Sequence, residues 1–280
     1  MAVILITDSG CDLDTAQAQE LNITLVPMTV RFGETEYLSG VNLSKEEFYN
    51  KLTESKELPT TSQPTPYDFE KAFQNVKNAG NEAVVLCVSS VLSGTYQSAC
   101  IAADSYEDCI HVVDTKAVSI AQKILLDYAV LLREQGLSAT EIASALEEKK
   151  NAVCAFGAVD TLEYLIKGGR LSKAAGAVGS MLGIRPVLTL SDGALVVAGK
   201  ARGPKAAISM TNKLVEETGI DFSMPFGMGY TGNDAAVTDA YLNNEDSVWS
   251  NHTVPVYHVG STVGTHAGPG LCIAAFFKKS

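Results

Sequence analysis

The first half of the chain alternates short apolar runs with segments of helical periodicity. Residues 2–7, 23–30, 83–89 and 110–114 are mainly aliphatic, which is typical of buried strands. Apolar residues in the segments between them recur at helical spacing, which indicates helices on both faces of a parallel sheet. The pattern predicts a three-layer α/β/α domain with a mainly parallel, Rossmann-like sheet.

Local signals mark the ends of several predicted helices. Ser44 and Ser138 each stand three residues before a glutamate, as in a capping box. Thr65 precedes a proline at the first helical position, and Gly80 follows the last periodic residue of that helix. A further, longer helix is expected over residues 121–136.

From about residue 151 the chain becomes richer in glycine and alanine. Residues 185–202 form two apolar runs around Ser-Asp-Gly, which predicts a hairpin. Residues 167–182 are expected to form a loop with a small-residue helix. Residues 254–260 are expected to form the last strand, followed by a loop that contains His266.

This change of pattern predicts two domains. A length of 280 residues exceeds that of most single domains. We expect an N-terminal α/β domain over residues 1–150 and a C-terminal α/β domain with a mixed sheet over residues 151–280. Any ligand is expected to lie between them.

Composition narrows the classes of partner. Hydrophobic residues make up 46% of the chain and the mean hydropathy is +0.11, so apolar surface either lines a cavity or fills an ordinary core. A formal charge of −11 argues against nucleic acid, because phosphate backbones attract clustered Lys and Arg. The first apolar run is too short for a signal peptide or membrane span, so a cytoplasmic protein without stable membrane insertion is expected.

Cysteine and histidine spacing favours neither a metal nor a disulfide scaffold. The 6 cysteines include no C-x-x-C pair, and the 4 histidines lack the spacing of metal ligands. We therefore expect no metal and no cofactor.

Three polar segments follow or flank the predicted strands, at residues 7–13, 59–65 and 89–98. Ligands of open parallel sheets bind beyond the carboxyl ends of the strands. Ser93 and Gly94 stand at a helix start, where free N–H groups favour a carboxylate or phosphate. The alternative, an ordinary N-cap and a tight turn, stays open at this point.

His266 lies in the glycine-rich segment 263–270, which favours a functional over a structural histidine. Ser93 and His266 raise the alternative of a serine-dependent acyl hydrolase, for which the chain lacks a G-x-S-x-G elbow. Asp114 is a candidate third member that sequence cannot place. A dinucleotide site ranks third, because G-x-G-x-x-G is absent after the first strand.

Five ordered motifs together resemble the DegV family. They are TDSGCDL, PTTSQPTP, SSVLSGTYQSA, GGRLS and VGTHAGPG, and they span nearly the whole chain. The resemblance implies a fatty acid held between two α/β domains of a monomeric lipid carrier that is not itself an enzyme. It further implies that a separate fatty acid kinase catalytic subunit phosphorylates the bound carboxylate, for phospholipid metabolism.

The resemblance also assigns residues. It places Thr61 and Ser93 on the carboxylate of the fatty acid and His266 in the same hydrogen-bond network. Ser62 and Gly94 are expected to make secondary contacts with the ligand. Arg170 and Arg202 are expected to lie on the surface that faces the kinase subunit.

Some positions depart from the family pattern. Gly203 and Pro204 interrupt a run that is more basic in many relatives, which thins the expected docking surface. Ser261 and Thr262 are more polar than expected beside a lipid. Cys272 stands where a smaller residue is usual, so the length or shape of the lipid tunnel is expected to differ.

Overall fold

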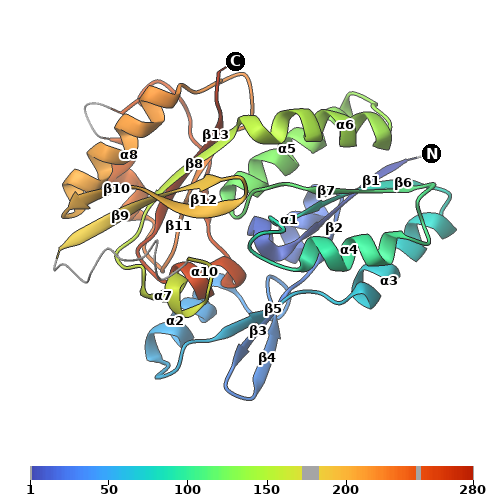
Figure 1. Cartoon of the computed structure of the whole chain (residues 1–280), viewed down its shortest axis with the longest axis horizontal. Coiled ribbons are helices and arrows are strands. Elements are labelled where there is room, and N and C mark those ends of the chain that lie inside the picture. Colours follow the sequence, from blue (N-terminus) through green and yellow to red (C-terminus); the bar gives the residue numbers. More distant parts are fainter. Residues whose placement is uncertain (1, 172–182, 244–246, 280) are drawn as a thin grey trace.

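The N-terminal half is built on a parallel four-stranded sheet in the order β2-β1-β6-β7 (Figure 1). The computed structural model describes residues 2–171, 183–243 and 247–279. The strands are β1 (Val3–Asp8), β2 (Ile23–Val26), β6 (Glu82–Cys87) and β7 (Ile110–Asp114). They are mainly aliphatic and mostly buried, because both faces of the sheet carry helices.

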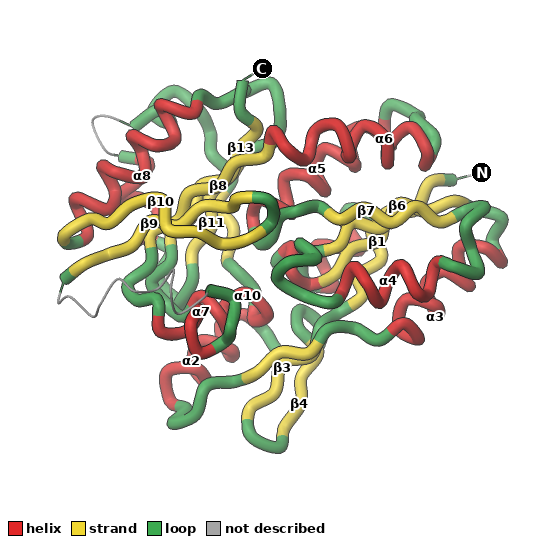
Figure 2. Tube along the Cα trace, viewed as in Figure 1, coloured by secondary structure: helices red, strands yellow, loops and turns green. Residues whose placement is uncertain are grey.

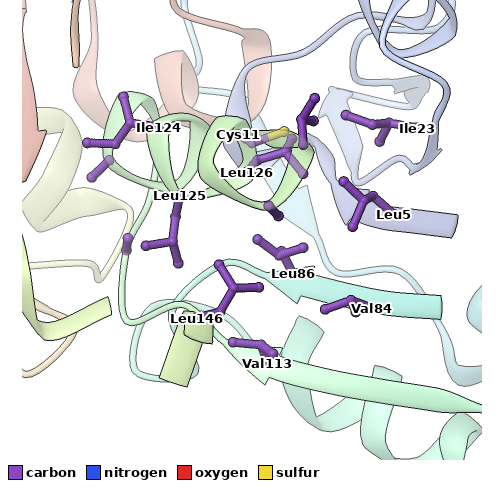
Figure 3. Packing of buried hydrophobic residues seen from close by; sticks show 14 of the residues in the cluster. Leu5, Cys11, Ile23, Val84, Leu86, Val113, Ile124, Leu125, Leu126 and Leu146 are labelled. Carbon is purple, nitrogen blue, oxygen red and sulfur yellow. The ribbon is translucent and has the colours of Figure 1, made fainter. Parts of the chain in front are cut away.

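Helices cover the two faces of this sheet separately. The helices α3 (Pro66–Asn78) and α4 (Thr95–Ala103) pack on one face. The other face carries α5 (Ile120–Glu134) and α6 (Ala139–Lys149). Figure 3 shows Leu125 and Leu146 on that face, in the same cluster as Leu86 and Val113 of the strands. The short elements η1 (Ser9–Cys11) and α1 (Thr15–Glu20) follow β1.

A small antiparallel sheet leaves the N-terminal half and reaches the other half of the molecule (Figure 2). Its strands, in the order β4-β3-β5, are β3 (Thr29–Phe32), β4 (Thr35–Leu38) and β5 (Thr60–Ser62). The helix α2 (Lys45–Glu54) packs beside it through Phe48, Tyr49 and Leu52.

Six described strands form the mixed sheet of the C-terminal half, in the order β10-β9-β8-β13-β11-β12. They are β8 (Val153–Ala158), β9 (Ile184–Ser191), β10 (Ala194–Arg202), β11 (Gly227–Tyr230), β12 (Val256–His258) and β13 (Cys272–Phe277). The elements around it are η2 (Lys150–Ala152), α7 (Glu163–Lys167), α8 (Pro204–Thr218), α9 (Ala236–Leu242) and α10 (Ser261–Ala267). α5 packs against β8 and β13 and so joins the two sheets.

The predicted fold class is confirmed, since one sheet is parallel and the other mixed. The capping box at Ser138 and the helix start at Thr65 and Pro66 are confirmed, whereas at Ser44 the described contacts include only the serine half of the predicted box. The predicted hairpin is also confirmed, and it turns at Asp192 and Gly193. The division at residue 150 lies between the two sheets and stays a prediction.

Several predicted elements are wrong. Residues 23–30 do not form one strand, because β2 and β3 belong to different sheets. The strand at 254–260 is not the last, since β13 follows it. His266 lies in helix α10 and not in a loop. Most of the segment 167–182 lies outside the described residues, so the expected small-residue helix is not described.

Candidate functional site

An apolar pocket lies where the two halves meet. The empty space within it is about 880 Å³ when the open solvent at its mouth is included. One wall is the inner face of the mixed sheet, with Ala155 and Gly157 of β8 between leucines and an isoleucine of β9 and β13. The N-terminal half adds Gly10, Ser119 and the loop after β6. Of the described lining residues, only Arg170 carries a full charge.

A hydrogen bond between the side chains of Thr61 and His266 lies in the wall of this pocket. Thr61 Oγ1 lies 2.8 Å from His266 Nε2, although 205 residues separate them in the chain. β5 supplies Thr61, and the last turn of α10 supplies His266. Burial, with the positive charge of Arg170, lowers the pKa of His266 to about 4. The imidazole is therefore neutral at neutral pH.

The close approach of His266 explains why the first residue of the GGRLS motif, Gly168, is a glycine. A Cβ on Gly168 would lie 2.2 Å from His266 Nδ1, so any side chain there would displace the ring. Nδ1 is buried and has no hydrogen-bond partner among the described residues. Sequence reasoning missed Gly168, because its backbone is ordinary helical and the close approach arises only in three dimensions.

Ser93 lines the same pocket as Thr61 and His266. Its Oγ lies 2.8 Å from Thr95 Oγ1, in the first turn of α4. Gly94 is the N-cap of that helix and does not line the pocket. A Cβ there would lie 2.2 Å from the Gln63 amide, which donates to the Gly94 carbonyl.

The other predicted site residues lie further away. Ser62 is the exposed end of β5 and does not line the pocket. Arg202 is exposed on β10, which leaves it available for the predicted docking surface. Arg170 is half-buried and lines the pocket, where its guanidinium donates to the carbonyls of Leu92 and Gly168. Its predicted role in docking the kinase subunit stays a prediction.

The TDSGCDL motif supplies two buried carboxyl groups. Asp8 accepts hydrogen bonds from the backbone N–H groups of Gly10 and Val88, and so fixes the loop after β6. Asp12 accepts from the N–H of Gly260 and the hydroxyl of Ser119. Burial raises the pKa of each carboxyl to about 6.

Several hydrogen bonds join residues 259–266 to the N-terminal half. Tyr49 Oη donates to the Val259 carbonyl, and Ser261 bonds to Ser39. Thr262 Oγ1 lies 3.1 Å from Ser9 Oγ, within hydrogen-bond distance. Ser261 and Thr262 thus help to hold the two halves together. Cys272 is buried in the core on the other face of the sheet and does not line the pocket.

The geometry of the pocket gives little support to a serine-dependent acyl hydrolase. The hydroxyl of Ser93 pairs with Thr95, and His266 pairs with Thr61, so the described contacts include no serine–histidine pair. Asp114 bonds to Ser90 and Lys116 instead of to His266.

Within the described ranges, no three metal-ligating side chains come together. None of the helices in these ranges has the length and apolar character that a membrane span needs.

The fold and pocket define a class of protein with two α/β halves and a buried apolar site between them. A family model described as "Uncharacterised protein, DegV family" matches residues 2–279. The chain belongs to the DegV family, as the sequence motifs predicted. A DegV domain-containing protein of Caldanaerobacter subterraneus subsp. tengcongensis is 32% identical over 99% of both chains.

Solved DegV structures share the whole fold. A Thermus thermophilus DegV family protein, described by its fatty acid binding, has a TM-score of 0.86 at 30% identity over 99% of this chain and 100% of its own. The Bacillus subtilis DegV, described as a fatty acid binding protein, has a TM-score of 0.85 at 29% identity over the same shares. A stearic acid-binding protein of Eubacterium ventriosum has a TM-score of 0.84 at 27% identity over 98% of each chain.

Proposed function

We propose that this protein binds a long-chain fatty acid in the pocket and presents its carboxylate to a separate kinase subunit that forms an acyl-phosphate. The observation that carries the proposal is a largely apolar pocket whose one full charge, among the described lining residues, is Arg170. A ligand with a single acid group and a long hydrocarbon tail matches this wall. The fatty-acid-binding relatives named above support it.

The neutral His266 determines how Thr61 meets the carboxylate. A buried N–H without an acceptor is costlier than a buried lone pair without a donor, so the orphan Nδ1 favours the tautomer with the proton on Nε2. Nε2 then donates to Thr61 Oγ1, and the Thr61 hydroxyl is free to donate to the ligand. Ser93 supplies a second neutral donor, and Arg170 favours the ionised acid.

This arrangement suits transfer of a phosphoryl group to the acid. One carboxylate oxygen attacks the γ-phosphorus of ATP while the bond to the ADP oxygen breaks, so ADP leaves. The attacking group is already an anion, and no general base is required. Neutral donors orient the carboxylate without occupying both oxygens, as a bidentate arginine would.

The tail supplies most of the affinity. At about 0.8 kcal/mol per buried methylene, a chain of ~14 methylenes contributes ~11 kcal/mol before the cost of immobilisation. Each neutral head-group hydrogen bond adds only about 0.5–1.5 kcal/mol.

Mass spectrometry of lipid extracted from the purified protein tests the binding step. We expect a fatty acid at close to one per chain, and a protein that neither carries nor takes up one would refute the proposal. The presentation step is tested with ATP and the catalytic subunit of a bacterial fatty acid kinase, by trapping the acyl-phosphate with hydroxylamine. Product should require all three components, and its absence with a loaded protein would refute the kinase role alone.

A further inference from the structure

Asp12 lies at the junction of the two halves, although it does not line the pocket. It is 4% exposed and ends η1 in the left-handed conformation, with φ of 64°. Its Oδ1 accepts the Gly260 N–H at 2.8 Å, and its Oδ2 accepts the Ser119 hydroxyl at 2.5 Å. One carboxyl group therefore joins three segments that are distant in sequence.

Both partners of Asp12 are helix N-caps. Gly260 begins α10 and Ser119 begins α5, and neither has a side-chain capping bond of its own. A helix N-terminus presents unpaired N–H groups and a partial positive charge, which a carboxylate stabilises. Asp12 accepts the N-cap N–H of α10 from outside that helix, whereas at α5 it accepts the hydroxyl of the N-cap serine.

Ser119 is held by these contacts in a strained conformation. Its backbone has φ of 60° and ψ of −136°, a conformation that residues with a side chain rarely adopt. Its N–H donates to the Gly10 carbonyl at 2.7 Å, while its hydroxyl donates to Asp12. Both Gly10 and Ser119 line the pocket. Strain of this kind persists only where surrounding contacts determine the geometry.

We propose that Asp12 is the positioning residue of the head-group site, holding Ser119 in the pocket wall and α10 at the distance where His266 meets Thr61. Asp12 fixes Gly260, the N-cap of α10, and His266 lies in the last turn of that helix. The role assigns a purpose to the last aspartate of the TDSGCDL motif. The inference rests on the proposed function for the identity of the ligand, a fatty acid. The His266–Thr61 contact is present in the structure without a ligand.

The experiment observes the head group directly. Protein stripped of lipid is loaded with [1-13C]stearic acid, and the carboxyl resonance is recorded by NMR. Asp12→Gly removes the carboxyl group without straining the left-handed backbone. We expect a shifted or broadened resonance with affinity within about tenfold of wild type, because the tail dominates binding. Asp12→Asn retains an acceptor for Gly260 and a donor for Ser119, so its resonance should match wild type.

Controls separate positioning from general stability. Phe73→Leu weakens the distant α3 core and should lower the melting temperature without moving the resonance. If Asp12→Gly behaves like Phe73→Leu, the proposal is overturned. If Asp12→Gly does not fold, Ser119→Ala, which loses only the hydroxyl, must shift the resonance, and an unchanged one overturns the proposal.

A second readout needs no ligand. The 15N signals of the His266 ring in lipid-free protein should change in Asp12→Gly and return in Asp12→Asn. If wild type binds no stearate, fatty acid binding fails, and these ring signals still decide the role of Asp12. Unchanged ring signals in Asp12→Gly would overturn it.

Discussion

Gly168→Ala should damage the head-group site without straining the backbone. Gly168 has φ of −74° and ψ of −8°, which alanine adopts readily. The new methyl would lie 2.2 Å from His266 Nδ1 and 3.0 Å from the Tyr164 carbonyl. Because the backbone there is held by the end of α7, the imidazole is expected to move and release Thr61.

The magnitude follows from the lost contact. One neutral hydrogen bond is worth about 0.5–1.5 kcal/mol, which corresponds to a fall in fatty acid affinity of about 2- to 13-fold. Overpacking should lower the free energy of unfolding by about 1–3 kcal/mol. Isothermal titration calorimetry with stearate measures the affinity, and NMR of the His266 ring reports its displacement.

Gly169→Ala is the matched control. Gly169 has φ of 73°, and no atom of the described residues lies within 4 Å of the position that a methyl group would take, so alanine there strains the backbone without meeting a described neighbour. It should cost about 1–2 kcal/mol of stability with stearate affinity unchanged. If Gly168→Ala binds stearate like wild type with unshifted ring signals, the assigned role of the His266–Thr61 contact is refuted.

Three further predictions concern the charge and hydroxyl groups. Burial lowers the pKa of His266 from 6.5 to about 4, so between these pH values the imidazole is protonated in the unfolded chain but not in the folded one, and the free energy of unfolding should fall by about 3 kcal/mol as the pH drops from 6.5 to 4. In urea titrations, His266→Gln should lose this pH-dependent loss of stability. The same pH dependence in His266→Gln and wild type would contradict the prediction. Thr61→Val should weaken stearate binding about 2- to 13-fold, whereas the exposed neighbour Thr60→Val should not; equal effects would count against the assignment. Arg202→Glu should reduce capture of the kinase subunit in a pull-down assay while stearate binding persists. In the control Lys56→Glu, at another exposed position, both capture and stearate binding should match wild type. Unaltered capture by Arg202→Glu would show that Arg202 is not part of the docking surface.

The parallel sheet of the N-terminal half could be predicted because its signals are local. Aliphatic runs and helix caps specified β1, β6, β7, α3 and α6 within a residue or two. The split of residues 23–30 into β2 and β3 could not be predicted, since each has only four residues. Their assignment to different sheets depends on pairing with strands far along the chain.

The head-group site was less accessible to sequence reasoning than the fold. Ser93 and His266 were candidates from their local sequence, but the resemblance alone placed them with Thr61 in one site, because no spacing rule relates residues that meet across the junction of two halves. The docking role of Arg170 also came from the resemblance and stays a prediction, whereas its place in the pocket wall was not predicted. A positive side chain after two glycines gives no sign of which way it faces.

Helix α10 shows why propensity alone fails at this site. Its sequence, STVGTHA, contains β-branched residues and a glycine, all poor helix formers, and seven residues are too few for a stable isolated helix. Gly264 is required because a Cβ there would lie 2.6 Å from the ring of Phe48 and 2.6 Å from the hydroxyl oxygen of Tyr49. Packing against the N-terminal half therefore makes this segment helical. Docking of the two halves and assembly of the His266 site are consequently one event, and a loop was the natural interpretation of the sequence.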